Sequence, residues 1–227
     1  MRPSKPNFFP LAIPFIIFLF LIVGTLIGLI ELGILRYAYE KMGIDRRYVF
    51  GLLLLSLLGS YVNIPVGKLP AERFLSNQQI SFFGMRHVIP FVKEWPRTVI
   101  AINLGGAVVP VLVSAYLILT NDMIGRALMG VIVVTAVVYR TARPLTGLGI
   151  AVPIFIPPAI AAVTALLLAP NLAPALAYTA GTLGTLIGGD LLNLSKIRGL
   201  GAPVVSIGGA GTFDGIFLTG IIAVLLA

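Results

Sequence analysis

The sequence predicts an all-α protein, a polytopic transmembrane helical bundle with six to seven spans. Of the 227 residues, 58% are hydrophobic and only 11% are charged, and the mean hydropathy is +1.04. A water-soluble globule of this length needs more polar surface than that. We therefore expect lipid to be the main solvent of the chain, and a Gly-rich broken or re-entrant segment before the last span.

A membrane-spanning helix needs about 20 mostly apolar residues, and seven windows meet or approach this length. They run over residues 8–31, 48–66, 99–120, 123–139, 150–169, 174–194 and 213–227. Because the second, fourth and seventh windows are short, six spans with one re-entrant or interfacial window is the alternative count. The first window is too long for a signal-peptide core and has no small-residue cleavage site, so we expect it to be retained as a span. We expect a single transmembrane domain over residues 1–227.

The orientation of the spans follows from the 16 Lys and Arg residues, because positively charged loops stay in the cytoplasm. Most of them fall on the side of the N-terminus, which is therefore predicted to be cytoplasmic in a multi-pass protein of the cell membrane. The residues on the other side are Arg36, Lys41, Arg46, Arg47 and Arg126. The net charge of +8 then reflects topology and attraction to anionic lipid headgroups. No basic and aromatic interleaving indicates nucleic-acid binding.

Residues 63–97 form the long polar stretch, which we expect to be a cytoplasmic interfacial loop. Within it, Gln79–Arg86 is compatible with a short hairpin or an amphipathic helix. The chain has no cysteine and one histidine, His87, which excludes thiolate and multi-histidine metal sites. We expect no metal and no cofactor.

Two of the eight acidic residues stand apart from the rest. Asp190 follows the uncharged run 171–189, and Asp214 begins an uncharged run that reaches the C-terminus. A carboxylate at membrane depth costs about 2.5 to 3.5 kcal/mol on insertion scales, so it indicates a functional site by default. The other six acidic residues lie in loops or at predicted span ends.

The glycine-rich segment 206–212 lies between these two carboxylates and is unfavourable for helix. The window after it covers only about 22 Å of a roughly 30 Å apolar core, so we expect the segment to dip into the membrane. Non-helical backbone at that depth is tolerated only against protein or a wet cavity. Asp214 is therefore expected to face a cytoplasm-side cavity together with Asp190.

Three interpretations of Asp190 and Asp214 remain open. Two carboxylates close together share a proton, which is what an aspartyl protease needs to activate water. The same pair suits a transporter that carries a proton or a cation. The structural alternative is that Asp214 complements a helix N-terminus after a Thr212 cap and that Asp190 pairs with Lys196 or Arg198.

Other polar or glycine positions are candidates for substrate binding or for lining the same cavity. These are Asn63, Asn103, Asn193, Gly209, Gly211 and Thr212. Asn63 and Asn103 fall at the cytoplasmic ends of their spans in the predicted topology, which agrees with a cytoplasm-side cavity. For the glycines and prolines near them, close packing and kinks are the structural alternative.

The runs Gly188–Leu194 (GGDLLNL) and Ser206–Phe217 (SIGGAGTFDGIF) resemble an uncharacterised prokaryotic family of multi-pass membrane proteins. The similarity extends from about Asn63 to the C-terminus, and it implies no activity. The same residues also resemble presenilin-type and prepilin-type intramembrane aspartyl proteases, which carry one Asp on a span and a second in Gly-x-Gly-Asp. The run Gly211–Asp214 (Gly-Thr-Phe-Asp) has the length of that motif but lacks the glycine before Asp.

The protease resemblance implies that Asp190 and Asp214 are the catalytic pair and that a membrane peptide is the substrate. Our leading hypothesis is an intramembrane aspartyl-protease-like hydrolase. The alternatives are a small secondary transporter or proton pathway that uses the same carboxylates, and a non-catalytic membrane scaffold. The expected partners are the lipid bilayer and either a membrane peptide or a transported ion, and a homo-oligomer is left open.

Overall fold

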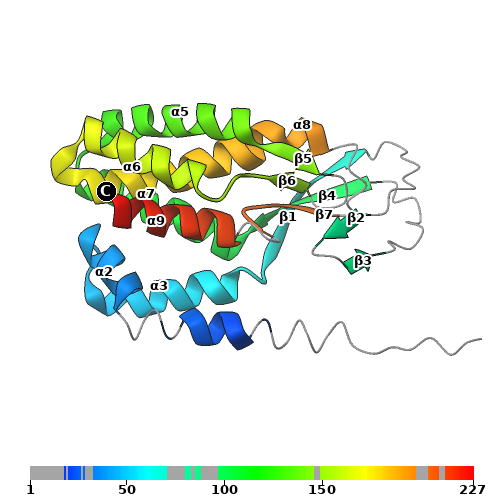
Figure 1. Ribbon diagram of the computed structural model, residues 1–227, viewed down its shortest axis with the longest axis horizontal. Coiled ribbons are helices and arrows are strands. Elements are labelled where there is room, and N and C mark those ends of the chain that lie inside the picture. Colours follow the sequence, from blue (N-terminus) through cyan, green and yellow to red (C-terminus); the bar gives the residue numbers. More distant parts are fainter. Residues whose placement is uncertain are drawn as a thin grey trace, which may run out of the picture.

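The protein is a mostly helical bundle closed at one end by a small β-sheet, as seen in a computed structural model (Figure 1). The structure describes residues 18, 20–26, 28, 33–70, 80–82, 85–87, 97–145, 149–197, 204–209 and 213–227. Residues 20–26 are helical. The other helices are α2 (Ile34–Lys41), α3 (Arg46–Gly59), α4 (Val109–Thr120), α5 (Ile124–Thr141), α6 (Ile156–Leu168), α7 (Ala173–Thr185), α8 (Leu194–Ile197) and α9 (Leu218–Leu226).

The strands lie at one end of the bundle (Figure 1). They are β1 (Asn63–Pro70), β2 (Ile80–Phe82), β3 (Met85–His87), β4 (Arg97–Asn103), β5 (Arg143–Leu145), β6 (Gly149–Ala151) and β7 (Val204–Ile207). In the main sheet the order is β1-β4-β7, with β4 antiparallel to β1 and parallel to β7. The pairs β2–β3 and β5–β6 form separate antiparallel hairpins.

Helix α7 is the centre of the bundle and packs against α4, α5, α6 and α9. Eleven of its 13 residues are buried, and most of these are small. A Cβ atom added at Gly184 would come within 2.6 Å of the Cβ of Val134 on α5, so only glycine allows this approach of the two helices. The hydroxyls of Ser114 and Thr182 lie 3.1 Å apart and link α4 to α7. Small residues and hydroxyl links of this kind are typical of helix packing in membranes.

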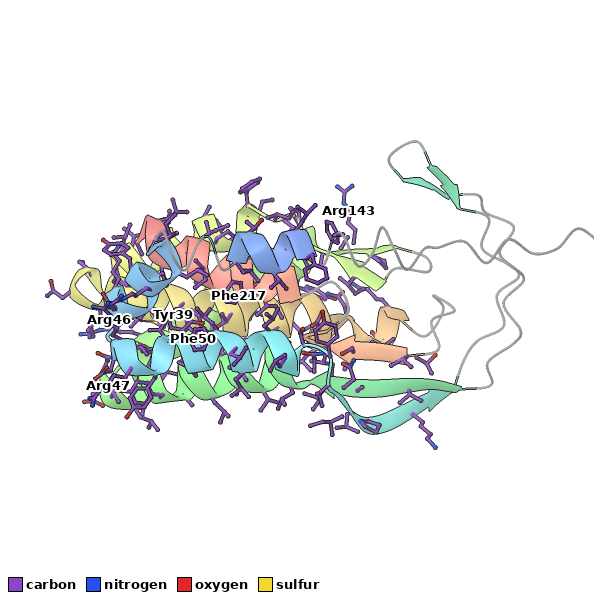
Figure 2. All side chains as sticks on the ribbon, turned by 90° about the horizontal axis from the view of Figure 1, so that it is seen from below. Tyr39, Arg46, Arg47, Phe50, Arg143 and Phe217 are labelled. Carbon is purple, nitrogen blue, oxygen red and sulfur yellow. The ribbon has the colours of Figure 1, made fainter. Side chains whose placement is uncertain are left out.

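The outer faces of the helices are apolar, as the outward side chains in Figure 2 illustrate. Large exposed side chains include Leu119, Leu128, Ile132, Phe155 and Leu167, of which Leu167 is 78% exposed. Within the described residues α5 is the one helix that is long and apolar enough to cross a membrane by length and composition. Shorter apolar helices cover Leu104–Thr120, Ile156–Leu168 and Gly215–Leu226.

The sheet is the main departure from the all-α expectation, although the mostly helical class is confirmed. The window 48–66 is helical only to Gly59, and its end belongs to β1. The window 99–120 begins with β4, and the window 150–169 begins in β6. Hydropathy does not separate a short apolar strand from the start of an apolar helix, so strand and helix merged into single windows. The expected interfacial loop 63–97 contains β1, the β2–β3 hairpin and the start of β4.

The helices near the sheet are also irregular. Three π-helical segments occur in the described part of the chain: η1 (Leu104–Val108), η3 (Leu186–Asp190) and η5 (Phe213–Phe217). The segments η1 and η5 lead into α4 and α9, and η3 continues α7. Short 3-10 turns are η2 (Pro170–Leu172) and η4 (Leu191–Asn193). Single π turns inside helices are frequently found at functional sites.

Candidate functional site

The candidate site lies where the sheet meets the bundle. Strands β4 and β7 are parallel neighbours, with Ile102 opposite Ile207, so both end at the same edge. Strand β4 ends at Asn103 and is soon followed by Gly105-Gly106. Strand β7 is followed directly by Gly208-Gly209. The pairing of β4 with β7 therefore brings together two glycine pairs that are about 100 positions apart in the sequence.

Gly106 and Gly208 pass so closely that no side chain fits between them. A Cβ atom on Gly106 would overlap the carbonyl oxygen of Gly208. Gly208 also has a φ of 70°, in the left-handed region that glycine enters without strain. This crossing fixes the start of η1 against the turn after β7.

A buried asparagine amide stabilises the crossing. Asn103 is fully buried, and its Nδ2 donates to the carbonyl oxygen of Ser60 at 2.6 Å and to Oδ1 of Asn63 at 3.1 Å. Its Oδ1 accepts the Gly106 N–H at 2.8 Å, which caps η1. The Ser206 hydroxyl donates to the same Asn63 oxygen. One small polar network therefore joins β1, β4, β7 and η1.

Asp190 is the last residue of η3 and reaches the turn after β7. Its Oδ2 accepts the Gly208 N–H at 2.8 Å, and the residue is half-buried. Of its two expected partners, Lys196 instead lies over the Tyr139 ring, with Nζ 4.4 Å from the ring centroid, and Arg198 lies outside the described residues. The carboxylate is therefore held by a backbone N–H, with no ion pair among the described residues.

The π turn that ends at Asp190 is stabilised by the side chain of Asn193. Asn193 is fully buried, and its Nδ2 donates to the carbonyl oxygens of Gly188 at 2.8 Å and Gly189 at 3.1 Å. Gly188 lies against α5, where an added Cβ would come within 2.6 Å of the Thr135 carbonyl oxygen. The backbone that carries Asp190 is therefore fixed on two sides.

A cavity of about 320 Å³ opens beside Asp190. Thr185 and Asp190 supply its polar side chains, and the rest of the lining comes from β6, the residues after it, η5 and α9. The lining residues are Ile150, Ala151, Val152, Ile154, Thr185, Gly189, Asp190, Gly215, Ile216 and Leu218. Gly215 directly follows Asp214, so both aspartates belong to elements that border this cavity.

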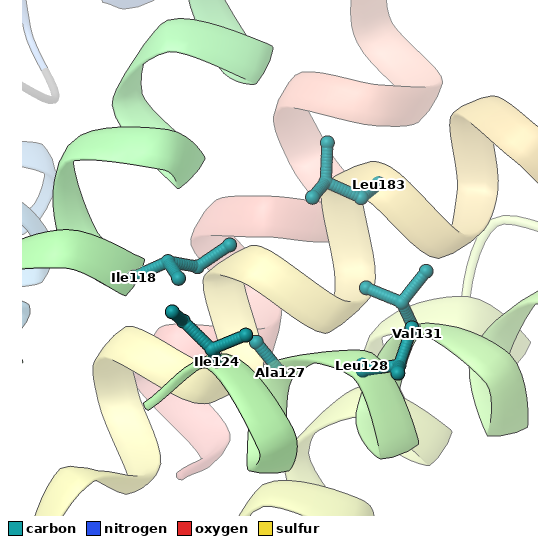
Figure 3. Close-up of a pocket in the computed structure, with 6 residues that line it drawn as sticks. All are labelled: Ile118, Ile124, Ala127, Leu128, Val131 and Leu183. Carbon is teal, nitrogen blue, oxygen red and sulfur yellow. The ribbon is translucent and has the colours of Figure 1, made fainter. Parts of the chain in front are cut away.

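A second hollow of about 240 Å³ lies among α4, α5 and α7, towards the α4–α5 turn (Figure 3). Its lining is entirely apolar: Ile118, Ile124, Ala127, Leu128, Val131 and Leu183. It carries no group that could bind an ion or transfer a proton.

The predicted site residues fall into three groups. The first group is Asp190, which borders the cavity at the sheet end. The second group forms the polar network and the turns beside the cavity and consists of Asn63, Asn103, Asn193 and Gly209. The third group lies wholly or partly outside the described residues. The backbone of Asp214 belongs to η5 but its side chain is not described, and Gly211 and Thr212 are not described.

The sequence reading missed Thr185, Ser206 and Gly208. Thr185 precedes Asp190 by five positions, a spacing that shares a face only in a π turn and not in the α-helix assumed for the span. Ser206 and Gly208 became important only through the pairing of β7 with β4.

A family model described as "Protein of unknown function (DUF1614)" matches residues 57–226. The chain belongs to this family. The DUF1614 match begins in α3 and ends in α9, so it contains the whole site. Neither the curated proteins nor the solved structures gave a match. The DUF1614 description names no activity.

The DUF1614 site offers acid–base chemistry. A carboxylate with one oxygen fixed by a backbone N–H, beside a hydroxyl in a mostly apolar cavity, can bind water and exchange a proton. No group of three or more His, Asp or Glu side chains that could hold a metal ion occurs in the described part of the chain.

Proposed function

We propose that this DUF1614 protein is a multi-pass membrane protein of six to seven spans, with its N-terminus and sheet end in the cytoplasm. The candidate span α5, the shorter apolar helices beside it and their exposed apolar faces support this proposal. Figure 2 places Arg46 and Arg47 at one end of the bundle and Arg143 at the other, as the loop assignment requires. Lipid would cover the outer faces, with basic residues at both rims.

We further propose that the cavity beside Asp190 is the centre of an intramembrane aspartyl-protease-like hydrolase. The observation that carries this proposal is that Asp190 and Gly215, the neighbour of Asp214, line one cavity. In this chemistry the ionised carboxylate takes a proton from water while the water oxygen bonds to the peptide carbonyl carbon. The protonated carboxyl gives its proton to the carbonyl oxygen. Collapse of the adduct then breaks the C–N bond, and a proton passes to the leaving amine.

The β-sheet offers an edge at which a peptide substrate could bind next to Asp190. Strand β7 is at the edge of the β1-β4-β7 order, and it leads directly into the turn that holds Asp190. Sheet edges bind extended peptides through backbone hydrogen bonds. An unwound segment of a membrane peptide is therefore the substrate class that we propose.

Substitution of each carboxylate tests the hydrolase proposal. Asp190→Asn and Asp214→Asn should each abolish cleavage of a panel of membrane peptides by the full-length protein in detergent. They should also abolish binding of a hydroxyethylene peptide isostere, a mimic of the aspartyl-protease adduct. Asp122→Asn is the matched control, because Asp122 is exposed and its φ of 46° suits asparagine. Normal turnover in either site variant would overturn the proposal.

A proton or cation pathway is the second candidate. It is favoured by the three π segments at one end of the bundle, of which two begin helices and one extends α7, since discontinuous helices commonly form transporter sites. Proteoliposomes would then show flux that Asp190→Asn removes and that the isostere does not change. If neither cleavage nor flux is detected and both Asp variants function normally in cells, the non-catalytic scaffold is the remaining interpretation.

A further inference from the structure

Thr185 has a buried hydroxyl without a hydrogen-bond partner among the described residues. Its side chain is 5% exposed and lines the cavity beside Asp190. The other buried threonines of α7 behave differently: Thr179 donates to the Ala175 carbonyl at 2.8 Å, and Thr182 donates to the Tyr178 carbonyl at 2.7 Å. Thr185 is therefore set apart within its own helix.

A buried hydroxyl of this kind requires a partner, because burial without a hydrogen bond costs free energy. The adjacent space is large enough to provide one: the cavity measures about 320 Å³, and a water molecule occupies about 30 Å³ in the liquid. A bound water also needs several polar partners. Thr185 and Asp190 are the polar side chains that this cavity offers.

The backbone places the two groups on the same side. Thr185 directly precedes η3, and Asp190 ends it, so the two residues are five positions apart across one π turn. Asn193 holds the carbonyls of Gly188 and Gly189 within this turn, and the Gly208 N–H holds one Asp190 oxygen. The hydroxyl and the carboxylate thus border one cavity from a fixed frame.

We propose that Thr185 is a positioning residue that holds the reacting water against Asp190. The Thr185 hydroxyl donates to the water oxygen, and the water points one proton at the carboxylate that will accept it. This inference rests on the proposed hydrolase function. It adds a residue that touches the water and orients it before the attack.

The test compares two probes on the full-length protein in detergent. One is the hydroxyethylene peptide isostere, whose hydroxyl takes the place of the water, and the other is the same peptide isostere without that hydroxyl. Wild-type protein should prefer the hydroxyl probe by about tenfold or more, the range that one or two hydrogen bonds give. Thr185→Val should remove most of this preference while affinity for the second probe changes less than about twofold.

Two further variants control for structure. Thr185→Ser restores the hydroxyl and should restore the preference, and Thr179→Val removes a buried hydroxyl elsewhere on α7 and should leave the preference unchanged. If Thr185→Val does not fold, Thr185→Ala gives the same comparison, because the readout is a ratio of two affinities measured on one protein.

The outcomes separate the inference from the function on which it rests. If neither probe binds wild-type protein, the hydrolase proposal fails and the inference fails with it. If both probes bind and Thr185→Val keeps the full preference for the hydroxyl probe, the inference is overturned while the hydrolase proposal stands. A preference lost in Thr185→Val and regained in Thr185→Ser supports both.

Discussion

The two ends of the helical bundle differ in how their polar groups are paired. At the end that carries α2, Arg36 and Glu40 form an ion pair at 2.8 Å. Arg47 and Asp45 form another at 2.9 Å, and the Lys41 Nζ donates to the Val224 carbonyl at the end of α9. At the sheet end no ion pair occurs among the described residues. The one acidic side chain described at that end, Asp190, is held by a backbone N–H.

The backbone differs between the ends in the same way. The α4–α5 turn at the α2 end is short and closed by Asn121, whose Nδ2 donates to the Leu117 carbonyl at 2.9 Å. The three π segments and the glycine crossing all lie at the sheet end. The unpaired buried oxygens of Thr185 and Asn193 lie there too. Irregular backbone and unsatisfied polar groups concentrate where proteins build sites, so the comparison favours the sheet end as the location of the proposed site.

The largest effect is expected from Gly106→Ala at the sheet end. The new Cβ would overlap the Gly208 carbonyl oxygen, and neither backbone can move without breaking the β4–β7 crossing. We expect a loss of about 3 kcal/mol or more in the free energy of unfolding. Gly125→Ala at the opposite end is the control, because its Cβ meets open space, and it should be neutral or stabilise by up to about 1 kcal/mol. Thermal unfolding in detergent compares the two, and equal melting temperatures would contradict the tight crossing.

Asn103→Ala should have the next largest effect. It removes three hydrogen bonds of a fully buried amide and leaves the Gly106 N–H uncapped, so we expect a loss of about 2 to 3 kcal/mol. The matched change at the other end is Asn121→Ala, which breaks a partly exposed cap and should cost less than about 1 kcal/mol. Urea unfolding of both variants measures the difference. A larger loss for Asn121→Ala than for Asn103→Ala would contradict the prediction that the buried Asn103 amide contributes more to stability.

Lys41→Met should produce a smaller loss at the α2 end. The Lys41 ammonium donates to the Val224 carbonyl at 3.1 Å, where a positive charge also favours the C-terminal end of α9. We expect a loss of about 1 kcal/mol. Lys196→Met, which removes an exposed contact with the Tyr139 ring, should cost about half as much. Melting temperatures at low and high salt test this, since salt should reduce both effects.

The smallest effect concerns pH at the α2 end. The Arg47 side chain and its backbone N–H both hydrogen-bond to Asp45, which lowers the pKa of this exposed carboxyl to about 2. A lowered carboxyl pKa stabilises the folded protein above the ordinary Asp value of about 3.9, and this contribution is lost as the pH falls towards about 2. NMR titration of the Asp45 carboxyl should give a midpoint near 2. Arg47→Met should move the midpoint upwards, and a wild-type midpoint near 4 would contradict the Arg47–Asp45 ion pair.

Several residues that the sequence singled out as site candidates lie close together in the structure, at the sheet end of the bundle. Asp190 stood out because the 46 residues before it, 144–189, carry no charge, and Asn63 and Asn103 because they lie near the ends of apolar windows. The structure places these three residues at one end of the bundle. The number of spans, the orientation and the roles of Asp190 and Asp214 stay predictions.

Composition and local hydropathy alone determined the mostly helical class, because both are properties of short segments and need no knowledge of distant contacts. The sheet could not be obtained in this way. Strand β7 pairs with β4 about 100 residues earlier, and hydropathy merged β4 with the helix that follows it. The same long-range pairing placed the Gly208 N–H on Asp190, and the π turn brought Thr185 to the cavity. Only the tertiary structure decided these contacts, because a hydrogen-bond partner is set by packing between elements and not by the residues next to it.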